Sequence, residues 1–190
     1  MEQLIIYKLT KNTMKKLLLS LALVAGLGFA ASAQTEGAVR KLSIGAEFGL
    51  PVGDFSEDNM FAGGSLQYEH PVAKSLNLTI SGGYLANFLT GDLKTFAEAA
   101  GAKTSTGYIP LKAGAKYYFG GNFYAAGEVG ASIGTTDGVG TAFAFAPGLG
   151  ASFSVADKSS LDFGLRYENW SKDGGSRGFI GLRAAYAFGL

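Results

Sequence analysis

The stretch IPLKAGAKYYFGGNFYAAGEVGASI, residues 109–133, decides the fold. Two arms that alternate between apolar and small or polar residues flank Gly120-Gly121-Asn122, a turn-forming trio. Successive side chains leave a strand on opposite faces, so a period of two predicts two strands joined as a hairpin. A three-residue connection places Phe119 opposite Phe123, which brings the large apolar side chains of both arms onto one face.

The two faces of this hairpin differ in a way that indicates a membrane protein. The apolar face carries no charge, and its aromatic residues gather at the turn end. The other face consists of Gly, Ala and Ser with a few Lys and Glu, and such small residues suit a narrow barrel interior. An apolar exterior, a polar interior and aromatic residues at the membrane interface are typical of a transmembrane β-barrel. Arms of roughly 9–11 residues are long enough to cross a bilayer at a tilt.

The same alternation recurs along the chain and predicts eight strands, an even number. The fold class is therefore all-β, an eight-stranded antiparallel up-and-down transmembrane β-barrel. Open sheet edges cannot be left in lipid, so the sheet has to close. Trp170 interrupts the expected polarity and predicts a bulge or a strand end nearby, and Leu93–Ala100 is expected to form a short helix. The predicted strands are 42–50, 62–70, 76–88, 109–119, 123–133, 141–153, 161–168 and 178–190.

Connection lengths predict the orientation of the barrel. The longer connections, 51–61, 90–106, 134–140 and 171–177, alternate with the short ones, 71–75, 120–122 and 154–159. Bacterial outer-membrane barrels have long external loops and short periplasmic turns. This places both termini in the periplasm.

Composition narrows the class of function. The chain has 190 residues, enough for one domain, and its 16% of charged residues is well below the usual share of about 25%. A formal net charge of +1 gives no basic surface for nucleic acid. The absence of Cys excludes disulfides, thiolate metal sites and a thiol nucleophile. We expect no cofactor and no metal site.

The N-terminal segment predicts a cleavable signal peptide. Lys15 and Lys16 precede an apolar run over 17–29, which is shorter than the ~18 residues of a membrane-spanning helix. Ala31-Ser32-Ala33 then supplies a cleavage signature, with cleavage between Ala33 and Gln34. Met14 is the expected start, so the predicted organisation is an over-extended start at 1–13, a signal peptide at 14–33 and a barrel domain at 34–190.

Several short stretches resemble the small outer-membrane β-barrel domain family of Gram-negative bacteria, with OmpA- and OmpX-type architecture. The resemblance covers the whole of residues 34–190. It implies an outer-membrane location, contact with the lipid bilayer and lipopolysaccharide, insertion by periplasmic chaperones and the barrel-assembly machinery, and a monomer. Many family members end on an aromatic residue, whereas here Phe188 precedes the terminal Leu190. The stretches that carry the resemblance are 49–55, 109–114, 117–121, 165–168 and 186–190.

Inward-facing charges predict what fills the barrel. Five acidic and four basic side chains nearly cancel, which favours mutual pairing over an ion-selective channel. The hairpin register places Glu128 opposite Gly114 and diagonal to Lys112 and Lys116, so we expect a Lys112–Glu128–Lys116 bridge that closes the lumen. The predicted lumen charges are Glu47, Glu69, Lys112, Lys116, Glu128, Asp162, Arg166, Glu168 and Arg183.

Three functions fit such a barrel. The favoured one is a structural or surface-interaction protein without enzyme activity, because eight strands leave an interior that side chains fill. The first alternative is a small porin or passive channel. The second, a lipid-modifying enzyme, is less favoured because His70, the single histidine, is expected at the periplasmic end, away from the outer leaflet.

Overall fold

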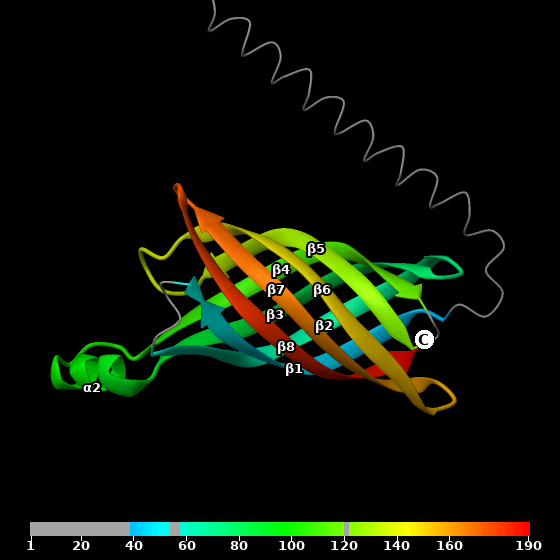
Figure 1. The fold of residues 1–190 in the computed structure, drawn as a ribbon, viewed down its shortest axis with the longest axis horizontal. Coiled ribbons are helices and arrows are strands. Elements are labelled where there is room, and N and C mark those ends of the chain that lie inside the picture. The colour runs from blue at the N-terminus through cyan, green and yellow to red at the C-terminus, as the bar shows by residue number, and fades with distance from the viewer. Residues whose placement is uncertain (1–38, 54–57, 120–121) are drawn as a thin grey trace, which may run out of the picture. The chain divides into compact units, whose positions relative to one another are not determined.

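The computed structural model describes residues 39–53, 58–119 and 122–190. The predicted start, signal peptide and Ala33–Gln34 cleavage site lie outside these residues. The described residues form a closed antiparallel barrel whose strands follow one another in chain order (Figure 1), as the sequence predicts. The strands are β1 (Lys41–Val52), β2 (Asn59–Ala73), β3 (Leu76–Leu89), β4 (Ser105–Phe119), β5 (Phe123–Gly134), β6 (Thr141–Ala156), β7 (Ser159–Lys172) and β8 (Gly175–Gly189).

Pairing between the first and last strands closes the barrel. Lys41 of β1 lies opposite Gly189 of β8, and Val52 lies opposite Gly178, so the two strands pair along the whole length of β1. Glu47 and Arg183 are direct partners in this register. A closed barrel has no free sheet edge, which is the condition for leaving a sheet in lipid.

The central hairpin adopts the predicted register. Phe119 lies opposite Phe123, and Gly114 lies opposite Glu128. Both pairings follow from the length of the turn, because a shift by one residue would move every apolar side chain to the other face.

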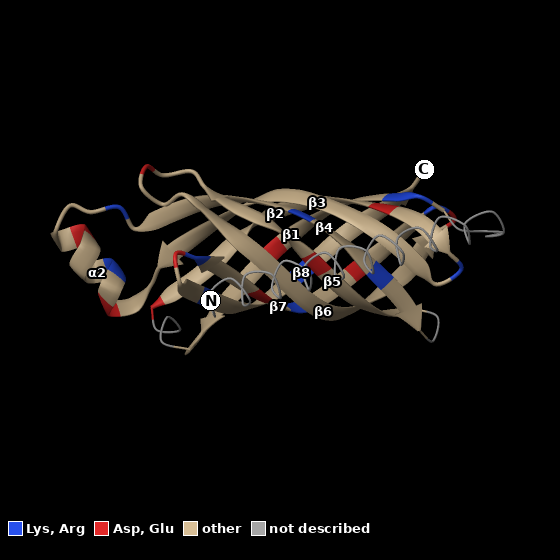
Figure 2. Ribbon diagram, turned by 90° about the horizontal axis from the view of Figure 1, so that it is seen from above, with Lys and Arg blue, Asp and Glu red and all other residues tan. Residues whose placement is uncertain are grey.

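The barrel is apolar outside and polar inside. Large apolar side chains are exposed along every strand, and Ile80, at 66%, is among the most exposed. Among the described residues, no Asp, Glu, Lys or Arg occupies an outward position of the strands. Nine charged side chains are buried or nearly buried on the inward face, and Figure 2 shows the charged positions along the barrel wall. This distribution is the reverse of that in a water-soluble protein.

The last hairpin corrects two predictions. Trp170 marks no bulge: β7 continues through it and ends two residues later, at Lys172, and the irregularity lies in β6 between Ser154 and Ala156. The expected loop at 171–177 shrinks to Asp173-Gly174, because both residues have positive φ (50° and 80°) and Lys172 pairs with Gly175. Asp-Gly with two positive φ angles is a tight hairpin turn whose twist matches the strands, so the strands continue to it.

The two ends of the barrel are unlike. At one end, α2 (Gly91–Ala99) lies between β3 and β4, close to the predicted helix, and Figure 1 shows it beyond the strand ends. The C-terminus lies at the opposite end. In the part of the chain that the structure describes, no helix has the length and hydropathy to span a membrane. We call the end that bears α2 the mouth.

Gly114 and Gly127 give a matched test of the hairpin. A Cβ added to Gly114 would collide with the carbonyl oxygen of Gly127 and lie 2.8 Å from the Cα of Glu128, whereas a Cβ on Gly127 would meet nothing within 4 Å. We expect Gly114→Ala to destabilise the barrel by about 1–3 kcal/mol, the usual cost of overpacking. Gly127→Ala should change the free energy of unfolding by less than about 0.5 kcal/mol. Urea unfolding in detergent measures both, and equal effects would contradict the packing around Glu128.

Candidate functional site

The barrel interior is the candidate functional site, and it contains two groups of side chains. The first is the charge network, formed by the nine predicted lumen charges. The second is the aromatic plug, which lies nearer the mouth. The plug consists of Phe61, Leu85, Tyr108, Ala144, Trp170 and Phe179.

Glu168 is the centre of the half of the network that adjoins the plug. Its side chain is fully buried, and one of its oxygens accepts from Lys112 Nζ at 2.9 Å and from Arg166 Nε at 2.6 Å. Its other oxygen accepts from Trp170 Nε1 at 2.7 Å. Arg166 also pairs through Nη1 with Glu47 at 2.6 Å. Glu168 thus compensates two buried cations and joins the network to the plug.

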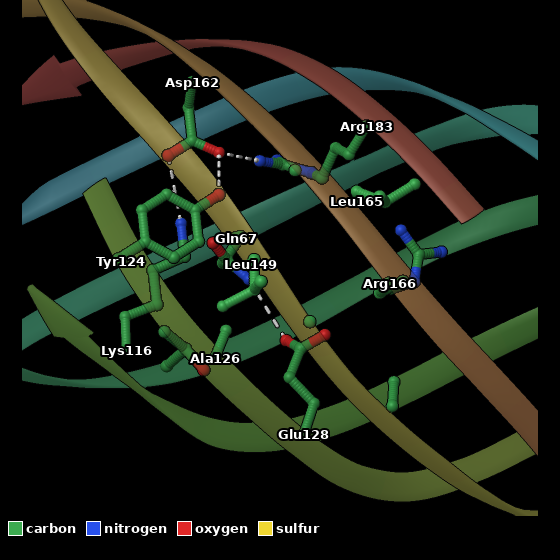
Figure 3. Close-up of a pocket in the computed structure, with 14 residues that line it drawn as sticks. Gln67, Lys116, Tyr124, Ala126, Glu128, Leu149, Asp162, Leu165, Arg166 and Arg183 are labelled. Carbon is green, nitrogen blue, oxygen red and sulfur yellow. Dashed lines mark hydrogen bonds and ion pairs between the residues drawn. The ribbon is translucent and has the colours of Figure 1, made fainter. Parts of the chain in front are cut away.

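Lys116 is the centre of the other half. Its ammonium lies 2.7 Å from Glu69 Oε1 and 3.2 Å from Asp162 Oδ2, and 4.5 Å from the centre of the Tyr124 ring. Tyr124 donates from its hydroxyl to Asp162 at 2.9 Å, and Tyr118 donates to Glu69 at 3.2 Å. Figure 3 shows Lys116, Tyr124 and Asp162 converging. Rings and charges therefore close the lumen together at this depth.

Arg183 connects the two halves. Its Nε lies 3.3 Å from Glu47 Oε1, and its Nη1 lies 3.7 Å from Asp162 Oδ1 (Figure 3). Its Nη2 donates to Ser43 at 3.0 Å. Each of the nine predicted charges has at least one ion-pair partner among the other eight, so the structure brings the whole set together.

The predicted Lys112–Glu128–Lys116 bridge is half right. Lys112 Nζ lies 3.3 Å from Glu128 Oε2, but Lys116 turns to Glu69 and Asp162. The remaining oxygen of Glu128 accepts instead from Ser81 at 2.9 Å and from Gln67 at 3.1 Å. Lys116 can reach both Glu69 and Asp162 across the lumen. Two carboxylates stabilise its ammonium more than Glu128 would, because Glu128 is already paired with Lys112.

The aromatic plug was not predicted from the sequence. Phe61 stacks on Phe179 with ring centres 4.6 Å apart, and Trp170 meets both rings edge-on at 5.3 and 5.2 Å. Tyr108 lies 4.8 Å from Trp170. These distances suit the tilted and stacked geometries that aromatic pairs prefer. The signal was present in the parity of the strands, because each of these residues occupies an inward position.

Little space remains inside the barrel. Two small cavities among the charges offer about 40 and 20 Å³ to the centres of water molecules. Roughly 10–15 Å³ by this measure suffices for one water. The larger cavity is lined by Gln67 and Thr79, whose Oε1 and Oγ1 atoms have no hydrogen-bond partner in the protein, so it is polar enough to be wet. Cavities of this size do not amount to a continuous passage for a solute.

Two other expectations concern chemistry. His70 lies outside the network, and its Nδ1 is 3.4 Å from the hydroxyl of Tyr68. Within the described residues, no three His, Cys, Asp or Glu side chains are placed to hold a metal ion.

Comparisons with known proteins identify the fold. No protein-family model matches the chain, and no curated protein matches it in sequence. Among solved structures, Neisserial surface protein A superposes with a TM-score of 0.57 at 14% identity, covering 82% of this chain and 100% of that one. The chain has the fold of the eight-stranded outer-membrane barrels. This confirms the predicted fold class and the architectural resemblance.

Two structures of Ail from Yersinia pestis agree with this outer-membrane barrel fold. Ail in complex with the heparin analogue sucrose octasulfate gives a TM-score of 0.53 at 18% identity, covering 78% of this chain and 97% of that one. Ail in a phospholipid bilayer nanodisc gives 0.50 at 18% identity, covering 78% and 99%. The eight-stranded barrel thus accounts for nearly the whole of these neighbours.

Proposed function

We propose that this chain is an outer-membrane protein that acts by contact at its mouth and not by passage through its barrel. The observation that carries the proposal is the filled lumen: nine mutually paired charges and a plug of aromatic rings occupy the space that a pore would need. An eight-stranded barrel has an interior that side chains can fill. A small porin is therefore disfavoured.

The outer surface supports membrane insertion. On the described strands, large apolar side chains face outward, and no outward position holds a charged residue. At roughly 25 cal/mol per Å², exposing this belt to water would be strongly unfavourable, whereas a bilayer covers it. Ail is named an outer membrane protein and is described in a lipid nanodisc. A monomer in contact with lipid and lipopolysaccharide, inserted by the barrel-assembly machinery with periplasmic chaperones, fits this surface.

The mouth supports an interaction role. On α2, Phe96 is 75% exposed and Leu93 is 45% exposed, although this helix lies beyond the strand ends. Apolar side chains presented in this way are typical of a contact surface. Ail is named an attachment invasion locus protein, and Neisserial surface protein A is named a surface protein. Both names are consistent with a role in contact at the cell surface. We propose a role without catalysis, in which the mouth faces outward and both termini face the periplasm.

Cysteine labelling tests this orientation. The chain has no Cys, so Lys103→Cys near α2 and Asn122→Cys at the opposite end each introduce a single thiol. We expect a membrane-impermeant maleimide to label Lys103→Cys on intact cells, and to label Asn122→Cys only after lysis. Labelling of both variants in lysed cells is the control. The reverse pattern on intact cells would invert the barrel and remove the basis for a role at the cell surface.

A further inference from the structure

Two ladders of the barrel wall are interrupted in mid-strand, and a proline lies in each interruption. Between β3 and β4 the register is the same throughout, but Gly83 and Tyr84 form no pairs with β4, and Pro110 stands opposite Gly83. Proline has no backbone N–H to donate to a neighbouring strand, so it is rarely found inside a paired strand. The first interruption therefore follows from Pro110.

Pro147 produces a second interruption of the same kind. Ala146 and Pro147 form no pairs with β7, although the register before and after them is the same. Pro51, near the end of β1, keeps its pairing with Phe179. The β4–β5 and β5–β6 ladders run without a gap, so β4, β5 and β6 form one continuous panel of the wall (Figure 1). This panel has a weakened junction with β3 on one side and with β7 on the other.

Both junctions lie at the depth where the plug meets the charge network. On the mouth side of the junctions lie two pairs of plug residues, Leu85 with Tyr108 and Ala144 with Trp170. On the other side lie Lys112 and Arg166, which both pair with Glu168. The mouth section of the panel therefore carries part of the plug and none of the network charges.

The outer face places the junctions at the edge of the apolar surface. Tyr84 and Tyr167 lie at the junctions and are 51% and 40% exposed, and outward aromatic residues mark the membrane interface in transmembrane barrels. Backbone groups that separate on the mouth side of this level meet water, whereas an unsatisfied group inside lipid is very costly. The mouth sections of these strands can therefore part without a penalty from the bilayer.

A side-chain bond fastens the mouth section of the panel to β7. Beyond the second junction, the β6–β7 ladder ends at Phe143. Lys172 of β7 crosses to the loop between β5 and β6, where its Nζ donates to the Val139 carbonyl oxygen at 2.7 Å. Arg177 Nη1 of β8 lies 3.5 Å from the hydroxyl of Tyr108, a longer contact between the panel and its surroundings.

We propose that the mouth section of the panel is a flap that opens at the two proline junctions and is latched by the bond from Lys172 to Val139. Opening draws Tyr108 away from Trp170, whose ring centres lie 4.8 Å apart in the closed form, and exposes the mouth face of the plug. The charge network lies on the other side of the junctions, so it continues to close the lumen. The mouth thus changes shape without becoming a pore.

Hydrogen exchange of the refolded barrel in lipid nanodiscs tests the flap. Mass spectrometry compares the flap peptides 105–109 and 142–146 with 178–182 of β8, which lies at the same end and pairs with β1 and β7 without a gap. Local opening exposes amides to exchange. We expect the flap amides that face β3 and β7 to exchange at least tenfold faster than those of 178–182, after correction for intrinsic rates.

Restoring a missing donor should close the flap. Pro147→Val keeps an apolar outward side chain and supplies an N–H opposite Tyr167, so exchange in 142–146 should slow at least threefold. Pro110→Ala is the equivalent variant at the first junction and should slow exchange in 105–109. Pro51→Val replaces a proline whose pairing is intact, and should leave both flap peptides unchanged.

Removing the latch should have the opposite effect. Lys172→Met deletes the donor to Val139, so exchange in 142–146 should become severalfold faster. Lys94→Met removes an exposed cation of α2 and should not alter it.

Two results would overturn the flap: exchange in both flap peptides as slow as in 178–182, or equal effects of Pro147→Val and Pro51→Val. The experiment requires neither conductance nor labelling at the cell surface. A barrel with uniformly slow exchange would therefore refute the flap alone, and a conducting barrel would refute the proposed function alone.

Discussion

Replacing Glu168 by glutamine is expected to destabilise the barrel more than any other single loss of charge. The variant leaves Lys112 and Arg166 without the carboxylate that lies 2.9 and 2.6 Å from them, in a site with no exposure at Glu168. Breaking a buried pair by removing one partner costs about 3–5 kcal/mol, because the remaining charge is left uncompensated. The readout is the urea midpoint of the refolded barrel, followed by Trp170 emission.

Two further variants separate charge loss from general damage. Glu98→Gln removes an exposed carboxylate whose partner Lys94 lies 3.8 Å away, and should cost less than about 0.5 kcal/mol. Lys112→Met in the Glu168→Gln background removes one stranded cation and should recover part of the loss. If Glu168→Gln were as stable as the parent, the network would be solvated and the lumen would not be closed by it.

Truncating the plug at Phe179 is the second change with a large expected effect. Phe179 is 1% exposed and packs on both Phe61 and Trp170, so Phe179→Ala leaves a cavity within the plug. Buried Phe→Ala substitutions cost about 3–5 kcal/mol. We expect a loss of that size in urea and a red shift of Trp170 emission as water reaches the indole.

Phe96→Ala is the matched control for the plug. Phe96 is 75% exposed on α2, so its truncation should leave the urea midpoint and Trp170 emission unchanged. A Phe179→Ala variant that is indistinguishable from this control would show that the plug is not packed in solution.

The sequence predicts those features of the barrel that depend on neighbouring strands. The three-residue turn alone fixes Phe119 opposite Phe123, and from it Gly114 opposite Glu128. Lys112–Glu128 follows, because the two residues lie on adjacent strands. Lys116 finds Glu69 and Asp162 on strands it does not neighbour, and the stagger that closes the barrel decides that contact.

The plug was missed for a different reason. Large aromatic residues were assigned to the outer face, where lipid favours them, so Trp170 looked like an interruption. The position is inward, and a ring can enter the lumen there because its Nε1 has Glu168 as an acceptor. Phe61 was left out because it was assigned to the loop before the predicted strand 62–70. Phe179 lay at an inward position of the predicted strand 178–190, but only the charged and small inward residues of that strand were considered. The dipeptide Asp173-Gly174 favours a tight hairpin turn. Predicting that turn from the sequence would have extended the two predicted strands to the observed ends of β7 and β8.

The conductance of the refolded barrel in a planar lipid bilayer tests the closed lumen most directly. Since paired charges and stacked rings fill the interior, the parent protein should insert without producing stable channel openings in concentrated salt. Insertion itself can be followed by protease protection of the strands in the same lipid. Long-lived open states of porin-like size in the inserted parent protein would contradict the account, and would show that the charges line a pore.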